Sequence, residues 1–372
     1  MLKATETILE IDLSALGHNY HYIKSRLKKE TKVMAVVKAF GYGSDAFELA
    51  KELVNLGIDY IAVAYVKEGV ALRDAGIKAP IVVLHPLPIN FDILIDRCLE
   101  PCLYSTKVLN HFIKIVSKKN QIDYPVHIKF NTGLNRLGFW KNDVDRVVKK
   151  LKETKALKVI SVFSHLAASE DLSEKEFTLN QIKTFKDISE NLIKSIGYKP
   201  MLHICNTSGI LNYPEAHLDM VRSGIGLYGF GNSEKENKNF KPIATLKSII
   251  SQIHIIEKGE TVGYNRAYKS ELESSRQKTA TIPVGHADGI SRAYGNGKGW
   301  VTINSQKALI IGNVCMDMLM VNVTDINCNE GDEVIIFGEL HTAEDLTEQI
   351  GSISYELITS ISQRINRVIC RK

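Results

Sequence analysis

The chain has 372 residues, of which 44% are hydrophobic and 24% charged, and its formal net charge is +5. This composition is typical of a globular protein, and the length predicts two domains. A net charge this small argues against a nucleic-acid-binding protein, and we interpret the lysine-rich stretch 147–158 as the solvated face of a helix.

The N-terminal segment and the cysteines bear on location and metal binding. Glu6 and Glu10 interrupt the start of the chain where a secretory signal needs an unbroken apolar stretch, and no later run approaches the ~18 apolar residues of a membrane span. We therefore expect a cytoplasmic protein. The six cysteines show no CxxC or Cys/His pairing, which favours reduced thiols over disulfides or a metal site.

Short apolar runs alternate with helical patterns from residue 32 to about residue 230. The predicted strands are 32–39, 60–65, 80–85, 100–105, 126–130, 159–165, 201–206 and 221–228. Apolar residues at steps of three and four predict helices between them, among others over 45–56, 107–118, 143–152 and 174–196. Eight such units joined by right-handed crossovers predict a (β/α)₈ barrel.

Beyond about residue 240 the pattern changes to β-branched runs separated by Gly, Asn and Asp turns. The runs are 244–256, 279–284, 300–303, 308–314, 319–323 and 333–338, and a helix is expected over 354–368. The polar stretch 232–240 marks the boundary. The predicted fold is thus an α/β barrel over residues 1–238 followed by a mostly-β domain over 239–372.

Lys38 is the first candidate for chemistry, because it ends the apolar run 33–37 and is followed by a turn. An amine that loses hydration without a partner has a lowered pKa and becomes nucleophilic near neutral pH. This favours a Schiff-base lysine. The alternative is a lysine whose stem is buried while its amine reaches solvent from a strand end.

Further polar residues lie at or after the ends of the predicted strands, where a barrel builds its site. They are Tyr42, Lys129, Asn131, His165, Asn206, Thr207, Ser208, Arg222, Ser223 and Gly224. Thr207, Ser208 and Gly224 lie in the loops after strands seven and eight, where barrels often bind phosphate, although such residues also form ordinary βα turns. Pyridoxal phosphate would explain both a phosphate site and an isolated buried amine.

Nine segments spread over both predicted domains carry a further signal. They are 35–43 (AVVKAFGYG), 127–138 (HIKFNTGLNRLG), 164–167 (SHLA), 206–208 (NTS), 219–229 (DMVRSGIGLYG), 262–265 (VGYN), 284–289 (VGHADG), 312–317 (GNVCMD) and 353–357 (ISYEL). With these segments in this order, the chain resembles the alanine racemases, which are fold-type III pyridoxal-phosphate enzymes, over nearly its full length.

The resemblance implies two catalytic residues. Lys38 would hold the cofactor through an imine, and Tyr264 would reach it from the β domain of a partner subunit. Exchange of configuration at Cα requires a proton to leave one face and another to arrive at the opposite face, so two groups must flank the cofactor. A chain from His165 to Arg222 is implicated in tuning Tyr264, and Arg222 would contact the pyridine nitrogen and keep it unprotonated.

The resemblance also implies the remaining contacts. Arg136 would approach the cofactor and the substrate carboxylate, Met316 and Asp317 would lie near the substrate across a dimer interface, and Lys129 is a possible carbamate. The other cofactor-binding residues would be Tyr42, His165, Asn206, Thr207, Gly224, Ile225 and Tyr355.

The chain departs from the family pattern at four places. Phe40-Gly41 replaces the usual Asn-Ala, Asn131 replaces an Asp, Ser223 replaces a Pro, and His286 replaces a Tyr that narrows the substrate entrance. Because histidine is smaller and titratable, His286 puts strict selectivity for alanine in doubt.

The expected function is interconversion of L- and D-alanine by a head-to-tail homodimer, which supplies D-alanine for the bacterial cell wall. One alternative is a racemase for serine or for several amino acids. A decarboxylase of similar architecture fits less well, given Arg222. A non-catalytic pyridoxal-phosphate carrier or amino-acid sensor is a third alternative, but such carriers are usually a lone barrel.

Overall fold

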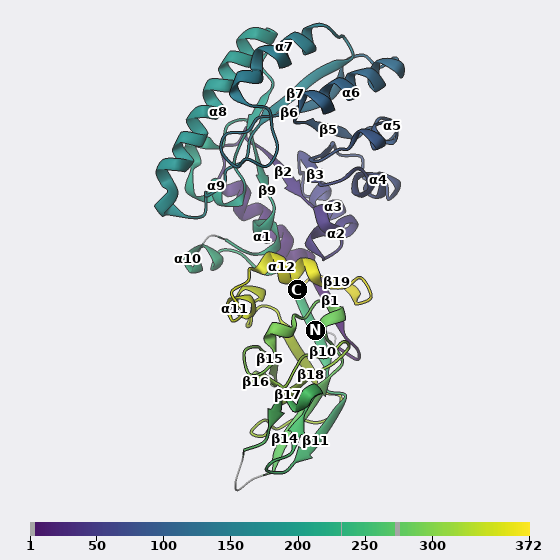
Figure 1. Ribbon diagram of the computed structural model, residues 1–372, viewed down its shortest axis with the longest axis vertical. Helices are drawn as coiled ribbons and strands as arrows, with labels where there is room; N and C mark the ends of the chain where they lie inside the picture. The colour runs from purple at the N-terminus through teal and green to yellow at the C-terminus, as the bar shows by residue number, and fades with distance from the viewer. Residues whose placement is uncertain (1–3, 232, 272–275) are drawn as a thin grey trace. The chain divides into compact units, whose positions relative to one another are not determined.

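The computed structural model describes residues 4–231, 233–271 and 276–372 (Figure 1). They group into two compact units. The barrel unit comprises Gly17–Gly41 and Ala46–Phe240, and the sheet unit comprises Met1–Leu16, Tyr42–Asp45 and Lys241–Lys372. The predicted division had placed residues 1–16 and 42–45 in the barrel. Asn232, in the predicted boundary, lies outside the described residues.

Eight parallel strands form the sheet of the barrel unit, in the order β8-β7-β6-β5-β4-β3-β2-β9. They are β2 (Lys32–Val36), β3 (Tyr60–Val63), β4 (Ile81–Val83), β5 (Glu100–Leu103), β6 (Tyr124–Lys129), β7 (Leu157–Phe163), β8 (Met201–His203) and β9 (Met220–Ser223). Backbone hydrogen bonds from Asp219 N to Leu202 O (3.1 Å) and from Arg222 N to Cys205 O (3.0 Å) link the two outermost strands. The predicted eight-stranded barrel is therefore confirmed.

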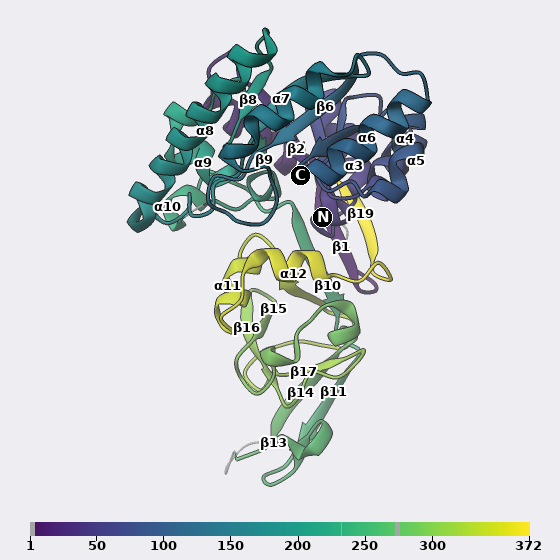
Figure 2. The same cartoon turned by 45° about the horizontal axis from the view of Figure 1, so that its top comes forward.

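Helices follow the strands and cover the outside of this sheet (Figures 1 and 2). They are α3 (Ala46–Asn55), α4 (Val66–Asp74), α5 (Phe91–Asp96), α6 (Thr106–Lys118), α7 (Val144–Lys152), α8 (Lys175–Ile196) and α9 (Thr207–Asn212), with α1 (Leu13–Ser25) before them and α10 (Glu234–Asn237) after them. The four helices predicted in this region are confirmed. The last predicted strand was too long, because residues 225–228 form a 3₁₀ helix instead.

The sheet unit contains a nine-stranded sheet in the order β11-β14-β17-β16-β15-β18-β10-β1-β19. Its strands are β1 (Ile8–Asp12), β10 (Ala244–Ile249), β11 (Gln252–Ile256), β14 (Gln277–Ile282), β15 (Trp300–Ile303), β16 (Gln306–Ile311), β17 (Leu319–Asn322), β18 (Glu333–Phe337) and β19 (Asn366–Cys370). A small ribbon joins β12 (Thr261–Val262) to β13 (Tyr268–Lys269), and the helices are α11 (Ala343–Glu348) and α12 (Ser354–Ser360). The predicted mostly-β character is confirmed.

Both ends of the chain contribute strands to this sheet. Strand β1 pairs antiparallel with β10 and parallel with β19. The sequence had predicted β10 but neither β1 nor β19. The helix predicted over 354–368 is wrong beyond Ser360, because Ile361 leaves the helical region with ψ 115° and the chain then extends into β19. Among the described residues, none of the helices has the length and hydropathy needed to cross a bilayer.

Candidate active site

Lys38 opens a left-handed turn directly after strand β2. Residues 39–41 have φ angles of 53°, 54° and 62°, a region that residues with a side chain rarely adopt. The amide of Ala39 donates to Glu68 Oε1 at 2.6 Å, and the amide of Gly41 donates to Val37 O at 2.9 Å. Strained backbone held by specific contacts is typical of functional sites.

The amine of Lys38 is poised for chemistry by its surroundings. Burial, followed by the positive charge of Arg136, lowers the pKa of Lys38, whereas Glu68 acts in the opposite direction. A larger neutral fraction at a given pH makes the amine a better nucleophile and base. The physical property predicted from the apolar run is therefore present.

Further positive groups surround Lys38. Burial, with Arg222, Arg136 and Lys38 adding to it, lowers the pKa of Lys129. The pKa of His165 lies well below its usual value, because of burial and of the same positive charges. Among the described residues, none of Lys38, Lys129, Arg136 and Arg222 is ion-paired with a carboxylate. Cations that lie close together without an ion-paired carboxylate fit an anionic ligand.

Arg222 is the most deeply buried member of the cluster. Its Nη1 lies 2.6 Å from His203 Nδ1, and its Nη2 lies 3.0 Å from His165 Nδ1. Nη2 also donates to the carbonyl oxygens of Ser164 (2.7 Å) and Ile204 (3.1 Å). Burial lowers the pKa of Arg222 to about 10, so the guanidinium stays charged near neutral pH. Arg222 is thus a fixed hydrogen-bond donor.

Arg136 is presented by a loop that follows β6. Asn131 Oδ1 accepts from the amides of Gly133 (3.2 Å) and Asn135 (3.0 Å), and its Nδ2 donates to Asn135 Oδ1 at 2.9 Å. A Cβ on Gly138 would meet Asn131 N at 2.5 Å, so the return of the loop requires glycine. Asn131 therefore retains a structural role where the family pattern has an Asp.

Thr207 and Gly224, two residues of the predicted phosphate site, are neighbours. Thr207 Oγ1 accepts from the amides of Gly224 (3.3 Å) and Gly226 (3.2 Å). A Cβ on Gly226 would lie 2.7 Å from Thr207 Cγ2, so the two loops approach too closely for a side chain. Asn206 caps α9 by accepting from Gly209 N at 2.9 Å, and Ile225 is buried.

Tyr42 and Tyr355 are neighbours within the sheet unit. Their ring centroids are 6.0 Å apart, and burial together with Tyr355 raises the pKa of Tyr42. Gly43 packs so tightly on α12 that a Cβ would lie 2.0 Å from Ile358 O, and Arg367 donates to Gly43 O at 2.8 Å. These contacts fix Tyr42 to the helix that carries Tyr355.

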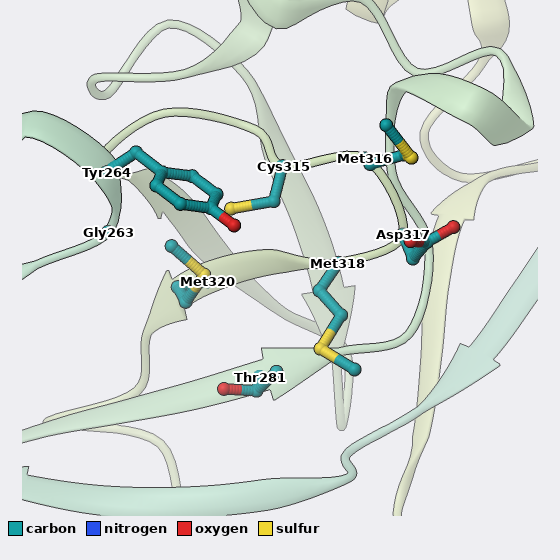
Figure 3. Close-up of a pocket in the computed structure, with 8 residues that line it drawn as sticks. All are labelled: Gly263, Tyr264, Thr281, Cys315, Met316, Asp317, Met318 and Met320. Atoms are coloured by element: carbon teal, nitrogen blue, oxygen red, sulfur yellow. The ribbon is translucent and has the colours of Figure 1, made fainter.

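Tyr264 lies in a separate pocket of the sheet unit of about 490 Å³. Figure 3 shows the Tyr264 ring and Cys315 on one side of the pocket and Met316 and Asp317 on the other. The remaining lining residues are Gly263, Thr281, Met318 and Met320. Tyr264 is 74% exposed and Met316 is 59% exposed, so two large side chains lie open to solvent beside one pocket.

Arg364, which the sequence had not singled out, and His286, which departs from the family pattern, lie in the same unit. Arg364 donates to Asp288 Oδ1 at 2.6 Å and to Asp317 Oδ1 at 2.7 Å, so Asp317 is held by an ion pair. His286 is exposed and its amide donates to Cys315 O at 2.9 Å. The predicted residues Asp317 and Met316 therefore share one connected region with His286.

The barrel unit brings together Lys38, Lys129, Arg136, His165 and Arg222, and the sheet unit contains two groups, Tyr42 with Tyr355 and Tyr264 with Met316 and Asp317. The sequence analysis did not single out Glu68 and His203. For Glu68 the sequence contains a signal of a helix start, because Glu68 stands three residues after Tyr65 at the beginning of a helical pattern. In the structure its Oε2 accepts from Tyr65 N at 3.0 Å.

Comparisons with known proteins match two parts of the chain to one family. The model for the alanine racemase N-terminal domain matches residues 11–231, and that for the alanine racemase C-terminal domain matches residues 243–369. The chain belongs to the alanine racemase family. Members of this family are isomerases that depend on pyridoxal phosphate.

Individual members of the alanine racemase family cover almost the whole chain. Alanine racemase of Thermodesulfovibrio yellowstonii is 37% identical over 366 residues, which is 96% of each chain. A solved alanine racemase structure from Clostridium difficile has a TM-score of 0.92 at 32% identity, covering 100% of this chain and 97% of that one. A structure of alanine racemase from Bartonella henselae with covalently bound pyridoxal phosphate has a TM-score of 0.90 at 27% identity, covering 99% of this chain and 100% of that one.

Proposed function

We propose that this chain is a pyridoxal-phosphate-dependent racemase that interconverts L- and D-alanine in the cytoplasm and supplies D-alanine for peptidoglycan. The observation that carries the proposal is the cation cluster around Lys38 in a chain that belongs, over both domains, to the alanine racemase family. A phosphorylated cofactor and an amino-acid carboxylate are both anions. They would supply the negative charge that the described barrel residues do not provide.

The donors present fit this cofactor. Lys38 offers a partly neutral amine for its aldehyde, and Thr207, Gly224 and Ile225 offer a close backbone turn for its phosphate. By the family resemblance, we also propose Tyr42, Arg136, His165, Asn206, Arg222 and Tyr355 as cofactor contacts. When bound, the cofactor withdraws electrons from Cα of the amino acid and so makes its proton acidic.

Lys38 and Tyr264 are the proposed acid/base pair. Lys38 accepts or returns a proton on one face of Cα, and Tyr264 of a second copy of the chain does so on the other face. The exposure of Tyr264 and Met316 supports a homodimer in which these side chains are covered by the partner. Met316 and Asp317 would then contact the substrate beside Arg136.

Arg222 limits the reaction to proton transfer in this proposal. A guanidinium has only donors, so it can donate to the pyridine nitrogen but cannot accept a proton from it. A ring nitrogen without a proton withdraws electrons less strongly, which disfavours side reactions such as transamination. The bonds of Arg222 to Ser164 O and Ile204 O hold the guanidinium in a fixed orientation for this role.

We also propose that Lys129 is carbamylated. The lowered pKa of Lys129, caused first by burial, favours the neutral amine that reacts with CO₂. The reaction would convert a cation next to Arg136 into an anion that pairs with it. An intact mass without the added CO₂ would contradict this proposal.

The test of the proposed function follows the α-proton of L- and D-alanine in D₂O by NMR. Wild type should exchange it from both enantiomers and form the other one. Tyr264→Phe should slow exchange from L-alanine by roughly 10²-fold or more and exchange from D-alanine far less, because Tyr264 serves one face of Cα. Equal loss for both enantiomers would contradict the assigned faces, and no exchange by wild type would contradict the function.

Substrate breadth is tested on the same enzyme. His286 stands where the family pattern has a tyrosine, and its side chain is exposed. If it widens the entrance, kcat/KM for serine approaches that for alanine, and His286→Tyr restores the preference for alanine. If the ratio of kcat/KM for serine to kcat/KM for alanine is the same in His286→Tyr as in wild type, His286 does not determine the substrate preference.

A further inference from the structure

A chain of hydrogen bonds crosses the interior of the barrel and ends at Arg222. Glu100 Oε2 lies 2.7 Å from His127 Nε2, and His127 Nδ1 lies 2.6 Å from Ser161 Oγ. Ser161 Oγ lies 2.9 Å from His203 Nε2, and His203 Nδ1 lies 2.6 Å from Arg222 Nη1. The chain passes through strands β5, β6, β7, β8 and β9 in order.

The two ends of this chain determine the direction of every bond in it. Arg222 can only donate, so His203 Nδ1 accepts and His203 carries its proton on Nε2. That proton goes to Ser161 Oγ, whose own hydrogen goes to His127 Nδ1. His127 then carries its proton on Nε2 and donates to the carboxylate of Glu100, which can only accept.

The opposite direction is incompatible with the same contacts. If Ser161 donated to His203 Nε2, His203 would carry its proton on Nδ1 and two donors would face each other at 2.6 Å. If His127 were an imidazolium, His127 Nδ1 and His203 Nε2 would both donate to Ser161 Oγ, and the Ser161 hydroxyl hydrogen would lose its acceptor. Burial lowers the pKa of His203 well below its usual value, which agrees with a neutral ring.

The surroundings keep these groups in place. His127, Ser161 and His203 are buried, whereas the side chain of Glu100 is 14% exposed, so the chain begins close to solvent at the first residue of β5. The His203 ring stacks on Phe163 with an interplanar angle of 4°, which prevents it from tilting away from Arg222. Buried networks in which every member is satisfied are rigid.

We propose that Glu100, His127, Ser161 and His203 form a positioning relay that fixes the tautomer of His203 and thereby the orientation of Arg222. The effect of this relay on catalysis rests on the proposed function, in which Arg222 donates to the cofactor ring nitrogen. The arrangement of protons in the relay is independent of the proposed function. Two readouts therefore separate the two proposals.

The first readout is the ¹⁵N and ¹H NMR spectrum of imidazole and guanidinium groups in the full-length wild-type protein, with and without pyridoxal phosphate. Both His127 and His203 should carry their proton on Nε2. A proton on His203 Nδ1 would overturn the relay whatever the activity. The expected tautomers in a protein that exchanges no alanine α-proton would leave the relay standing and remove the proposed function.

The second readout compares variants with matched controls. Ser161→Ala and Glu100→Met each remove an acceptor. They should move the His203 and Arg222 signals and lower kcat roughly tenfold at nearly unchanged KM, because a buried donor is left unsatisfied. Glu100→Gln keeps an acceptor oxygen and should stay within about twofold of wild type. Ser189→Ala removes an equally buried serine that donates to Phe185 O at 2.8 Å, outside the relay.

Two further outcomes would overturn the proposal. If Ser161→Ala moves the His203 and Arg222 signals no more than Ser189→Ala does, Ser161 does not link the two rings. If the signals move but kcat and the rate of side transamination stay at the wild-type values in both relay variants, the relay does not position Arg222 for the reaction.

Discussion

The two units of the molecule treat buried positive charge differently. In the sheet unit, the Lys247 side chain is 1% exposed, and its Nζ lies 2.9 Å from Glu10 Oε1 and 3.5 Å from Glu333 Oε2. In the barrel unit, Arg222 and Lys129 are also buried, but among the described residues no carboxylate pairs with them. A buried charge without a partner is costly. The charge of Lys247 therefore serves the fold, whereas we propose that the charge of Arg222 serves a ligand.

The largest effect on stability is expected for Lys247→Met. Removal of one member of a buried pair costs about 3–5 kcal/mol, and the lower end of this range is expected here, because Lys372 Nζ still lies 2.8 Å from Glu10 Oε2 whereas Glu333 loses its lysine. Denaturant unfolding of the variant and of wild type measures the difference in the free energy of unfolding. A loss below about 1 kcal/mol would show that Lys247 is not needed by the sheet unit.

The barrel counterpart is Lys129→Met, measured without ligand and in CO₂-free buffer, so that wild-type Lys129 carries a bare amine. Removal of this cation also removes its repulsion by Arg222, Arg136 and Lys38, so the free energy of unfolding should stay within about 1 kcal/mol of wild type or rise. Racemase activity should fall, since Lys129 faces the proposed site. A destabilisation as large as that of Lys247→Met would contradict the difference between the units.

Much of this architecture could be predicted from the sequence. The strands of the barrel are buried on both faces and therefore appear as continuous apolar runs, which made all eight recognisable. Strand β1 was missed because Glu10 interrupts its apolar pattern, and the two lysines that pair with Glu10, Lys247 and Lys372, lie far away in the sequence. Strand β19 was missed because residues 361–368 continue an apolar pattern that also fits a helix.

Some residues of the candidate site could be predicted from the sequence, and others could not. Lys38 could be recognised from its position at the end of an apolar run, and several other positions, such as His165 and Arg222, from their place at strand ends. The positions that came only from the family resemblance are Arg136, Ile225, Tyr264, Met316, Asp317 and Tyr355. The relay could not be predicted, because the alignment of His127 with Ser161 and of Phe163 with His203 depends on the register between strands. Strand register is a tertiary property that a single sequence does not reveal.

The smallest expected effect concerns the pKa of Lys38. Arg136 is the second cause of its lowering, after burial, so Arg136→Gln should move the pKa of Lys38 upward toward its usual value. The amine is then protonated up to a higher pH, and the pH above which it reacts with an aldehyde rises. NMR titration of the lysine Nζ measures this shift. The control is Arg146→Gln, which removes an exposed arginine paired with Asp143 and should leave the pKa unchanged.

The most direct measurement traps pyridoxal phosphate on the full-length chain by borohydride reduction and locates the label by peptide mass spectrometry. The predicted result is a single label on Lys38, retained in a control variant of an exposed lysine, Lys51→Ala, and lost in Lys38→Ala. A label on another lysine, or labels scattered over the surface lysines, would contradict the claim that the barrel cations are arranged around Lys38 to hold this anion.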